Sequence, residues 1–561
     1  MRRGAVLFTG ALAAAWTAAR ARPPERPGPI ASRIRFEEVA RQAGLDFVLE
    51  NCPTPRKHLI ETMPGGVAAF DYDGDGRPDV FFANGASVPG LRKDDPRYAN
   101  RLFRNVGAMK FVDVTEAAGL GGAGYSMAAA VGDYDNDGRP DLFVGGVHRQ
   151  LLYRNLGGRF EDVTERAGLA SDAWVVGAGW FDYDNDGRLD LIVVNYTTWS
   201  PDFDRFCGDA SRDIRVYCHP RWFPPVALSL YHNRGDGTFE DVSGRSGIAR
   251  RKGRGMAVAF ADYDQDGLTD VYVTEDALPS ALFHNRGDGT FEETALLAGA
   301  SVPEHGKDVS AMGVDFRDYD NDGRPDIAVT ALAGESFPLY RNLGRGAFQD
   351  ATHASRLGPL VATRSGWGNG LVDFDDDGWK DLFTANAHVN DEIERFESNR
   401  YRLTDSVFVN RGDGTFADGS AAAGLDAVPP RAHRGAAFAD FDGDGRVDVV
   451  VSALGAPAEL WWNRSAPGGH WLDVRLVGTK SNRDGMGAVI KVTARSDPRW
   501  REQWNQMTSA VGYASSTHGP VHFGTGTAKT LDTVEVRWPS GLVQVLSDVA
   551  ADQVLTVRET P

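Results

Sequence analysis

Short apolar runs recur along the chain in pairs, one on each side of an acidic segment. Residues 67–70 and 436–438 precede two of these segments, and residues 80–82, 191–194 and 449–451 follow three of them. The runs are short and rich in β-branched and aromatic residues, which is typical of buried strands. The pattern therefore predicts a repeated unit of strand, acidic loop and strand.

A second pattern between the acidic segments predicts a hairpin. It reads aromatic-x-Asn-x-Gly and then Phe-x-Asp-Val-Thr, as at residues 103–107 and 111–115, and further copies begin at Tyr153, Tyr231 and Tyr340. Two short strands separated by an Asn/Gly turn form a β-hairpin. Each unit thus has four strands: A and B around the acidic loop, then C and D in the hairpin.

Seven such units predict an all-β fold, a seven-bladed calcium-binding β-propeller over residues 33–465. The seventh unit has a C strand at residues 460–463 but no D strand after it, and a matching segment stands at residues 36–40. We therefore expect the N-terminal strand to complete the last blade and close the ring, which leaves no open sheet edge. An open array with capping ends is the alternative. A propeller would also have a deep central channel.

The acidic loops all read Asp-x-Asp-x-Asp-Gly-x-x-Asp. Four carboxylates in nine residues repel one another unless a cation lies between them, and hard oxygen ligands at alternating positions suit Ca²⁺. The Gly at position 6 permits the sharp turn round the ion. An EF-hand is excluded because it needs a Glu at position 12 and helices on both sides. Position 12 is held by Phe82, Val144, Val193, Val273, Val329, Thr384 and Val451.

We expect about seven Ca²⁺ sites, with side-chain oxygens from positions 1, 3, 5 and 9 and a backbone carbonyl from position 7. The predicted ligands are Asp71, Asp73, Asp75, Arg77, Asp79, Asp133, Asp135, Asp137, Arg139, Asp141, Asp182, Asp184, Asp186, Arg188, Asp190, Asp262, Asp264, Asp266, Leu268, Asp270, Asp318, Asp320, Asp322, Arg324, Asp326, Asp373, Asp375, Asp377, Trp379, Asp381, Asp440, Asp442, Asp444, Arg446 and Asp448. The alternative is that some loops are acidic turns that bind the ion weakly or not at all. The aromatic residue at position 2 of each loop is expected to pack between blades.

The net charge of the 561-residue chain is −18. Seven divalent cations would offset most of it, so the acidity is mainly ligand charge. Basic residues do not cluster, which argues against nucleic acid as a partner. No nucleophile-elbow, zinc or phosphate-loop motif is present, so we predict no catalytic residues. Three Arg-Gly-Asp sequences, at residues 234–236, 286–288 and 411–413, fall at hairpin turns that need Gly, and turn chemistry accounts for them better than adhesion does.

The N-terminus has the layout of a signal peptide over residues 1–21: Arg2 and Arg3, an apolar stretch, and Ala-Arg-Ala ending at Ala21. An uncleaved anchor is the alternative. Residues 22–32 are a Pro-rich linker. We therefore expect a secreted, periplasmic or cell-surface protein that is not a transmembrane protein.

Two insertions stand out as candidate ligand sites, at residues 195–225 and 386–402. The first is rich in aromatic residues and contains Cys207 and Cys218, which would pair as a disulfide in an oxidising compartment, leaving Cys52 as a free thiol. Aromatic loops with a few polar groups suit stacking on sugars or gripping a protein. The ligand candidates are Trp199, Tyr217, His219, Trp222 and His388. The alternative is that these aromatic side chains only close the insertion on itself.

Residues 468–561 form a separate compact β domain in this interpretation. Alternating runs at residues 471–477 and 489–492 predict half-buried strands, and a sandwich-like domain of about seven short strands fits the length. Residues 481–485 could form another ion loop, but a single acidic residue favours a turn.

With these motifs described, the chain resembles the extracellular FG-GAP/VCBS-repeat propellers, and more closely the cartilage acidic protein 1 family with its C-terminal ASPIC/UnbV domain. The similar segments are residues 61–67, 217–220, 385–389, 481–488, 522–524 and 534–541. One departure is Ala387, where the family usually has Gly. The resemblance implies a secreted calcium-binding protein, but the molecular activity of the family is poorly defined.

The sequence as a whole favours a secreted calcium-binding module that binds an extracellular glycan or protein. A calcium-dependent enzyme, polysaccharide-active or natural-product-modifying, is the alternative. Such an enzyme would use residues of the insertions near a calcium, such as His388 and Glu392, and the deep central channel expected of a propeller favours it.

Overall fold

The computed structural model describes residues 33–203, 205–466 and 468–560. The predicted signal peptide and linker, residues 1–21 and 22–32, lie outside the described residues. Within the described part of the chain, no helix is both long and apolar enough to span a membrane. The fold is all-β, with only short helical turns between strands.

Each acidic loop joins the first two of four neighbouring strands, and we number these sets as sheets 1 to 7 in the order of their loops; two further strands, described below, extend sheet 1. Sheet 1 contains β2(Val67–Phe70), β3(Asp79–Phe82), β4(Arg101–Gly107) and β5(Lys110–Asp113), and sheet 2 contains β6(Tyr125–Gly132), β7(Asp141–Val147), β8(Gln150–Asn155) and β9(Phe160–Asp162). Sheet 3 contains β10(Val175–Phe181), β11(Asp190–Asn195), β15(Ser229–Asn233) and β16(Phe239–Asp241), and sheet 4 contains β18(Gly255–Ala261), β19(Asp270–Glu275), β20(Ala281–Asn285) and β21(Phe291–Glu293). Sheets 5 to 7 are β22(Val314–Arg317), β23(Asp326–Val329), β24(Leu339–Gly344) and β25(Ala347–Asp350); β26(Gly366–Val372), β27(Asp381–Asn386), β28(Ser406–Asn410) and β29(Phe416–Asp418); β30(His433–Ala439), β31(Asp448–Ala453), β32(Glu459–Asn463) and β1(Phe36–Glu38).

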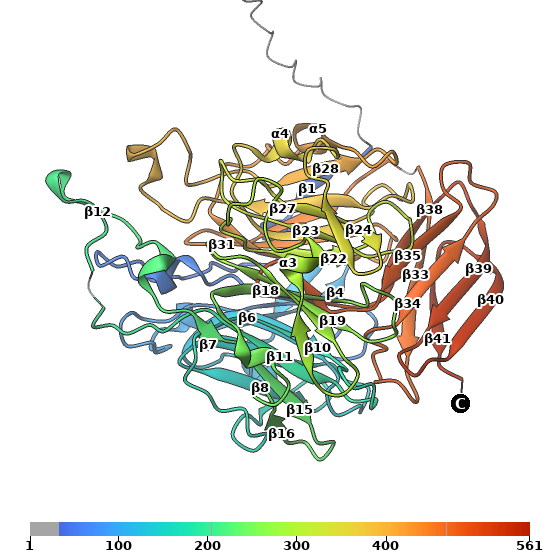
Figure 1. Ribbon diagram of the computed structural model, residues 1–561, viewed down its shortest axis with the longest axis horizontal. Coiled ribbons are helices and arrows are strands. Elements are labelled where there is room, and N and C mark those ends of the chain that lie inside the picture. The colour runs from blue at the N-terminus through green and yellow to red at the C-terminus, as the bar shows by residue number, and fades with distance from the viewer. Residues whose placement is uncertain (1–32, 204, 467, 561) are drawn as a thin grey trace, which may run out of the picture.

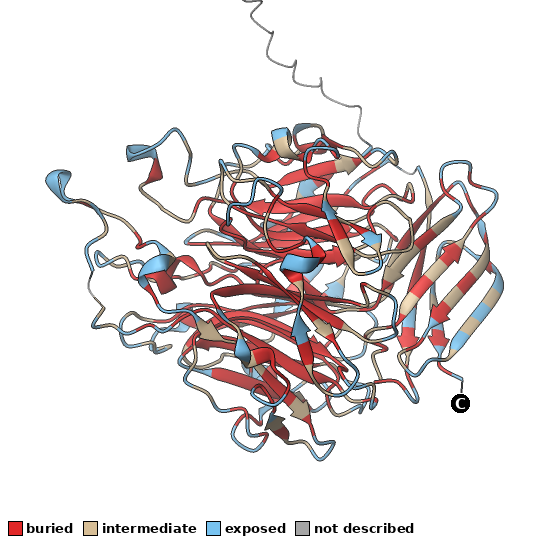
Figure 2. Ribbon diagram, in the orientation of Figure 1, coloured by how far each residue is buried: buried red, intermediate tan, exposed pale blue. Residues whose placement is uncertain are grey.

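The seventh sheet draws its strands from both ends of the chain, as the displaced segment at residues 36–40 predicts. Strand β1 pairs antiparallel with β32, and Phe36 lies opposite Asn463. Within all seven sheets the strands follow one another as antiparallel neighbours. The innermost strands are buried along almost their whole length, and Figure 2 shows this burial throughout the body of the molecule.

The short helical turns lie mostly between the sheets and in the insertions. They are α1(Ala40–Ala43), α2(Thr115–Ala118), α3(Ala295–Ala298), α4(Leu357–Val361), α5(Ser420–Ala423), and the 3₁₀ turns η1(Leu59–Thr62), η2(Pro96–Tyr98), η3(Ala210–Arg212), η4(Pro220–Trp222), η5(Ile248–Arg250) and η6(Ile393–Arg395). Two small ladders accompany them, β12(Gly208–Asp209) with β13(Ile214–Arg215), and β14(Val226–Ala227) with β17(Lys252–Gly253).

Neighbouring sheets are joined by the same two contacts each time. The aromatic residue at loop position 2 packs on the Phe that begins the last strand of the next sheet, as predicted: the Tyr72 and Phe160 ring centroids are 6.3 Å apart. The hairpin Asn of that next sheet donates from its side chain to the position-2 carbonyl, as Asn155 does to Tyr72 over 2.8 Å. Both contacts place a large apolar ring and a buried amide at each junction.

The same contacts also join the seventh sheet to the first. Phe441 of loop 7 packs on Phe111 of β5 with centroids 5.7 Å apart, and Asn105 of β4 donates to the Phe441 carbonyl over 2.8 Å. The sequence of junctions therefore returns to its start.

A hairpin from the C-terminal region fills the space between the innermost strands. Its two strands, β36(Ala510–Val511) and β37(Ser515–His518), contact the first strand of every one of the seven sheets, and β37 pairs with β2. Inner edges of such strands carry unpaired N–H and C=O groups, and the hairpin supplies partners: Gly512 exchanges hydrogen bonds with Val314, and Ser515 accepts from the Val67 amide. The expected open central channel is therefore wrong.

The remaining C-terminal strands form two sheets. One contains β33(His470–Val477), β38(Val521–Gly526) and β41(Gln553–Arg558); the other contains β34(Val489–Thr493), β35(Glu502–Gln506), β39(Thr530–Arg537) and β40(Val543–Ala550). They lie at the right in Figure 1, against the acidic loops. Lys380 of loop 6 donates to the Trp504 carbonyl over 2.9 Å, and the Arg483 amide donates to Asn136 of loop 2 over 2.8 Å. The insertion that carries β12 lies at the opposite, left-hand end.

Candidate metal loops and the insertion-end site

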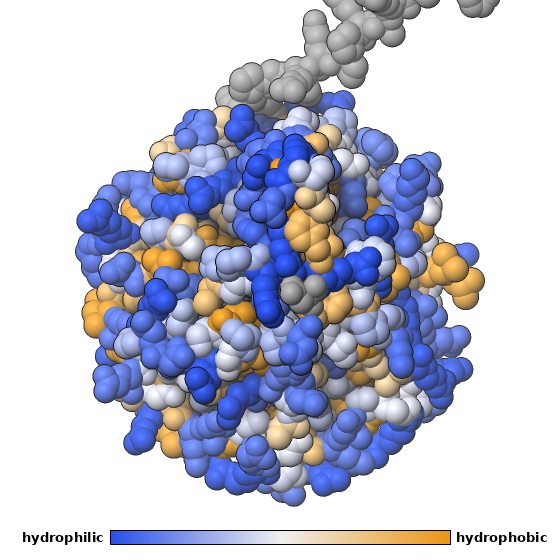
Figure 3. Space-filling model, turned by 90° about the vertical axis from the view of Figure 1, so that its left-hand side faces the viewer, coloured by the Kyte–Doolittle hydropathy of each residue, from blue (hydrophilic) through white to orange (hydrophobic). Residues whose placement is uncertain are grey.

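Two regions hold candidate functional groups, and they lie at opposite ends of the seven sheets. We call the seven Asp-rich loops the acidic-loop end. We call the surface formed by residues 51–62, 195–225 and 386–402 the insertion end. Figure 3 looks onto the molecule from the side on which β12 lies, where hydrophilic side chains predominate and apolar ones are scattered between them.

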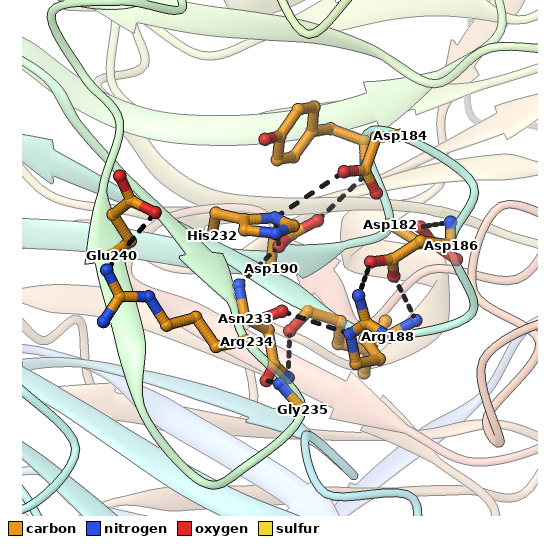
Figure 4. A network of polar contacts seen from close by, with 12 residues as sticks. Asp182, Asp184, Asp186, Arg188, Asp190, His232, Asn233, Arg234, Gly235 and Glu240 are labelled. Carbon is orange, nitrogen blue, oxygen red and sulfur yellow. Dashed lines mark hydrogen bonds and ion pairs between the residues drawn. The ribbon is translucent and has the colours of Figure 1, made fainter.

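Each acidic loop is folded by its own carboxylates, and loop 3 illustrates the arrangement (Figure 4). Asp182 at position 1 accepts hydrogen bonds from the backbone N–H groups of Asp186 and Gly187, both at 3.0 Å. Asp190 at position 9 accepts from the Tyr183 amide at 3.3 Å and from the Asn233 amide at 2.8 Å. Position 1 therefore closes the turn, and position 9 ties the loop to its own hairpin.

The carboxylates at position 3 have the features of cation ligands. Five of them have a buried Oδ1 with no hydrogen-bond partner in the described structure, namely Asp73, Asp135, Asp264, Asp320 and Asp442. Groups such as Asp71, Asp73 and Asp75 bring ligand atoms within 4.8 Å of one another. A buried acceptor without a donor is costly, and a cation at this point would satisfy it.

The electrostatics of the loops point the same way. Burial raises the pKa of Asp79 to about 8, and the neighbouring carboxylates Asp73 and Asp71 raise it further. Burial raises the pKa of Asp182 to about 7, with Asp190 and Asp186 adding to the shift. A divalent cation would favour the ionised form of each carboxyl group. The residues therefore fit Ca²⁺, which positions 1, 3, 5 and 9 would hold by side-chain oxygens.

The loops differ in the polar side chain that faces position 3, which the sequence patterns did not single out. In loops 1, 2 and 5 it is Arg, and Arg104 Nε lies 2.7 Å from Asp73 Oδ2. In loops 3 and 4 it is His; His232 lies 3.6 Å from Asp184 and 3.1 Å from Asp190 (Figure 4). In loop 7 the Trp462 indole N–H donates to Asp442 over 2.9 Å. In the sequence, this side chain is the middle residue of each aromatic-x-Asn motif, so that position could have identified it.

Other side chains join one loop to the next or to the C-terminal sheets. The position-4 side chains of Asn136, Asn185, Gln265 and Asn321 each donate to the Gly carbonyl at position 6 of the following loop. Asp484 accepts from the Asp133 amide over 2.8 Å, so residues 481–485 form a docking turn, with Gly485 N bonded to Asn482 O.

Two cavities remain between the acidic loops and the C-terminal sheets. One of about 200 Å³ is lined by Asp71, Asp440 and His518, and one of about 280 Å³ by Asp262, Trp504 and other residues. The C-terminal sheets thus leave space beside some of the acidic loops that they cover.

At the insertion end, two of the predicted ligand candidates face inward. Trp199 is buried and packs on the His58 ring, with centroids 5.5 Å apart. Tyr217 is buried and donates to Glu61 Oε2 over 3.1 Å. Both rings therefore close the insertion onto the body of the protein rather than on itself.

The other three candidates lie in different surroundings. His219 is exposed and caps η4 by accepting from the Arg221 amide at 3.2 Å. Trp222 is 42% exposed, with the Arg205 guanidinium 3.5 Å from its ring centroid. His388 is buried, accepts from the Asn390 amide at 3.0 Å, and has its pKa lowered by burial. Only His219 and Trp222 present large surfaces to a partner in this conformation.

A disulfide holds the first insertion together. Cys207 and Cys218 are bonded, with Cα atoms 5.3 Å apart. Cys52 is free and accepts a long hydrogen bond from the Tyr98 hydroxyl, 3.6 Å away. The bridge closes the loop that carries η3 and β13.

Residues far apart in sequence complete the insertion-end site, and the sequence patterns missed them. Glu61 is fully buried; it accepts from Thr54 Oγ1 at 2.6 Å, and burial raises its pKa. Arg434, also fully buried, donates to the Thr62 carbonyl at 2.7 Å and lies over the Trp367 ring at 3.9 Å. Tyr513, at the tip of the C-terminal hairpin, donates to the Met63 carbonyl at 2.7 Å. No local motif marks this convergence; only the similarity of residues 61–67 to the family pointed near it.

The Arg-Gly-Asp sequences occupy hairpin turns. Gly235 has a φ of +76°, its amide donates to Asn233 Oδ1 at 2.9 Å, and Asp236 accepts from the Thr238 amide at 3.0 Å. The Asp side chain is thus engaged in the turn itself.

Comparisons with known proteins agree with this architecture. The model of the FG-GAP-like repeat matches residues 71–144, 133–193, 216–273, 270–329, 318–384 and 373–451, and the ASPIC and UnbV model matches residues 478–561. The chain belongs to the family of FG-GAP-like repeat proteins, and cartilage acidic protein 1 is among its relatives. Human cartilage acidic protein 1 is 28% identical over 346 residues, which cover 60% of this chain and 48% of that protein. The Xenopus tropicalis protein is 27% identical over 55% of this chain and 45% of its own. The chain thus spans about half the length of these relatives.

Solved structures give a weaker likeness. An Agrocybe aegerita lectin, described as recognising non-reducing terminal N-acetylglucosamine, has a TM-score of 0.36 at 15% identity, with 70% of this chain and 87% of the lectin covered. A rhamnogalacturonan lyase from Bacillus licheniformis also has a TM-score of 0.36, at 13% identity, covering 71% of each chain. Neither likeness is close enough to bear on the ligand of this protein.

Proposed function

We propose that the protein is a secreted, calcium-stabilised seven-bladed propeller that binds an extracellular glycan or protein through its insertion end. The junctions that return from the seventh sheet to the first support the closed ring. The two C-terminal sheets would form a sandwich-like domain that caps the acidic loops. In this proposal Ca²⁺ neutralises and cross-links each acidic loop, and this chain's carboxylates at positions 1, 3, 5 and 9 hold it.

One observation carries the binding function: separate segments converge at the insertion end and no motif for catalysis accompanies them. Glu61, Tyr217, His388, Arg434 and Tyr513 come from five different parts of the chain. Loops positioned by a rigid scaffold are where binding groups concentrate. The exposed Trp222 beside Arg205 adds a surface on which a sugar ring or a protein side chain could stack.

Glycan and protein arrays, probed with Ca²⁺ and with chelator, test the proposal. We expect hits that depend on Ca²⁺ and that weaken about tenfold in Trp222→Ala, since stacked aromatic side chains often anchor such contacts. Leu297→Ala is the matched control, because Leu297 is 90% exposed on α3, outside the insertions. The absence of any calcium-dependent hit on either array would count against a binding module.

A calcium-dependent enzyme is the second candidate, and one observation favours it. The Glu61 carboxyl is fully buried with a raised pKa and lies beside the Tyr217 hydroxyl, an arrangement typical of general acids and bases. Glu392, considered from the sequence, instead pairs with Arg395 at 3.3 Å. Turnover that is lost in Glu61→Gln and kept in Glu392→Gln would replace the binding module with an enzyme.

A further inference from the structure

Arg434 is a buried cation whose charge is not matched by a neighbouring acid. Its side chain is 0% exposed, and no carboxylate among the described residues lies within ion-pair distance. Two backbone carbonyls, of Thr62 and His433, accept from Nε and Nη1 at 2.7 Å. Nη2 is buried and has no hydrogen-bond partner in the described structure. A buried charge is normally paired, so Nη2 is a donor that an anionic ligand could use.

Arg254 occupies the equivalent place in another sheet, but it has acidic residues nearby. Arg254 precedes Gly255 at the start of β18, as Arg434 precedes Gly435 near the start of β30. Burial raises the pKa of Glu275 and of Asp276, and the nearby positive charge of Arg254 offsets part of each rise. Its guanidinium also donates to the Phe223 carbonyl at 3.2 Å. The arginine at this position therefore has acidic residues near it in sheet 4, whereas Arg434 in sheet 7 has none within ion-pair distance among the described residues.

The groups around Arg434 are aromatic rings and hydroxyls. The guanidinium lies 3.9 Å from the centroid of the Trp367 ring, and the hydroxyls of Tyr401, Tyr513 and Tyr217 are near enough to interact with its charge. Tyr513 and Tyr217 use their hydroxyls on Met63 and Glu61. Tyr401 is only half-buried and stands at the border of the site. Planar rings with hydroxyl groups suit a sugar, and the guanidinium suits a carboxylate on it.

We propose that Arg434 binds the carboxylate of a sugar acid, which completes the hydrogen bonding of Nη2 at the insertion end. This inference rests on the proposed binding function and names its ligand class. Tyr401 and His388 belong to the insertion at residues 386–402, and because Arg434 is fully buried, entry of the ligand would require this segment to move. An Arg–carboxylate contact is charge-assisted and stronger than a neutral hydrogen bond, and it would set acidic sugars apart from neutral ones.

Calorimetry with glucuronate-containing oligosaccharides and their neutral glucose counterparts tests the proposal, in calcium buffer and on the full chain. We expect the wild type to bind the acidic oligosaccharide about tenfold or more tightly than the neutral one. Arg434→Met should lose that preference, and Arg254→Met should keep it. Because Arg434→Met could fail to fold, two further measurements give independent readings. Free glucuronate should compete with the acidic oligosaccharide for the wild type. The variant Tyr401→Phe should bind the acidic oligosaccharide more weakly.

The outcomes separate this inference from the broader function. Equal binding of acidic and neutral sugars, or no competition by glucuronate, overturns the role of Arg434 while glycan binding stands. Capture of proteins but of no glycan on the arrays overturns the sugar-acid ligand. A rise in melting temperature with chloride or acetate as large as that with glucuronate reduces the site to an adventitious ion only. If neither a glycan nor a protein binds, the proposed binding function itself is overturned.

Discussion

The two ends of the molecule differ in how they are built. The acidic-loop end repeats one nine-residue motif seven times, and its position-1 and position-9 carboxylates accept the same backbone hydrogen bonds in each copy. The insertion end is assembled once, from segments separated by up to several hundred residues, as in the contact of Tyr513 with Met63. Regular repetition builds the scaffold, whereas the site depends on contacts that occur in a single place.

The C-terminal region links the two ends physically. Its sheets lie on the acidic loops, and its hairpin passes between the innermost strands until Tyr513 reaches the insertion end. Perturbations at one end should therefore reach the other through this hairpin. We expect loss of the ions to have the largest effect, followed by truncation of the hairpin tip, loss of one junction between sheets, and loss of the disulfide.

Removal of Ca²⁺ should have the largest effect. A ligand that binds only the folded state stabilises it by about 2.7 kcal/mol per site at a free concentration of 100 times Kd, and seven sites act together. We expect chelator to lower the melting temperature strongly in calorimetry, and added Ca²⁺ to restore it. An unchanged melting curve in chelator would show that the loops are acidic turns without an ion.

The pH dependence of the chelated protein sharpens this test. The pKa of Asp79 is raised from its ordinary value to about 8, so the folded state holds more protons than the unfolded state between about 4 and 8. The free energy of unfolding of the chelated protein should then increase as the pH falls through this window. With Ca²⁺ bound, the carboxylates stay ionised and this increase should disappear. A chelated protein that loses stability in the same window contradicts the assignment.

Truncation of the hairpin tip should have the next largest effect. Tyr513 is fully buried against Trp367, with ring centroids 4.9 Å apart, and its hydroxyl donates to Met63. Tyr513→Ala removes this packing and leaves the carbonyl unpaired, so we expect a loss of about 3–5 kcal/mol in chemical unfolding. Val545→Ala on β40 is the control, because Val545 is 57% exposed and should change stability by about 0.5 kcal/mol or less. If Tyr513→Ala were as stable as this control, the hairpin tip would contribute little to the free energy of unfolding.

The sequence was most informative about the acidic-loop end. Alternation of apolar runs and Asp-rich loops predicted the strands, and the missing last strand predicted that the N-terminal strand completes the seventh unit, as the pairing of β1 with β32 shows. The aromatic residue at position 2 was correctly expected to pack between sheets. These features could be predicted because each is encoded within about ten residues and repeated, so any one copy is checked by the others.

The insertion end could not be predicted in the same way. The Ser- and Gly-rich segment at residues 509–519 has no apolar alternation, and its role depends on the inner strand edges of other sheets. Arg434 sits at the start of an ordinary strand, and only the fold reveals that no acid accompanies it. The sequence identifies Tyr217 and Trp199 as ligand candidates, but it does not show that they face inward. Their contacts with Glu61 and His58 set this direction, and those residues lie about 140 residues or more earlier in the chain.

Loss of one junction between sheets should cost less than loss of the hairpin tip. Asn285 donates to the Tyr183 carbonyl at 2.7 Å and to the Thr269 carbonyl at 3.2 Å, and it is buried. Asn285→Ala leaves two buried acceptors without donors, and we expect a loss of about 2 kcal/mol in urea unfolding. The matched control is Asn399→Ala at the insertion end, whose side chain bonds only to Glu397 near the surface. Equal effects of the two variants would remove the structural distinction between the two ends.

The smallest effect on global stability should come from the disulfide between Cys207 and Cys218. The bridge closes a short loop with a sequence separation of 11, so it restricts the unfolded chain by about 3 kcal/mol at most. Because it lies in a surface insertion, the double variant Cys207→Ser with Cys218→Ser should shift the melting temperature by about 2 °C or less. It should, however, increase proteolytic cleavage near β12 and weaken binding through Trp222. A large fall in melting temperature without faster cleavage would mean that the insertion is part of the scaffold, and the division of the molecule into two ends would have to be redrawn.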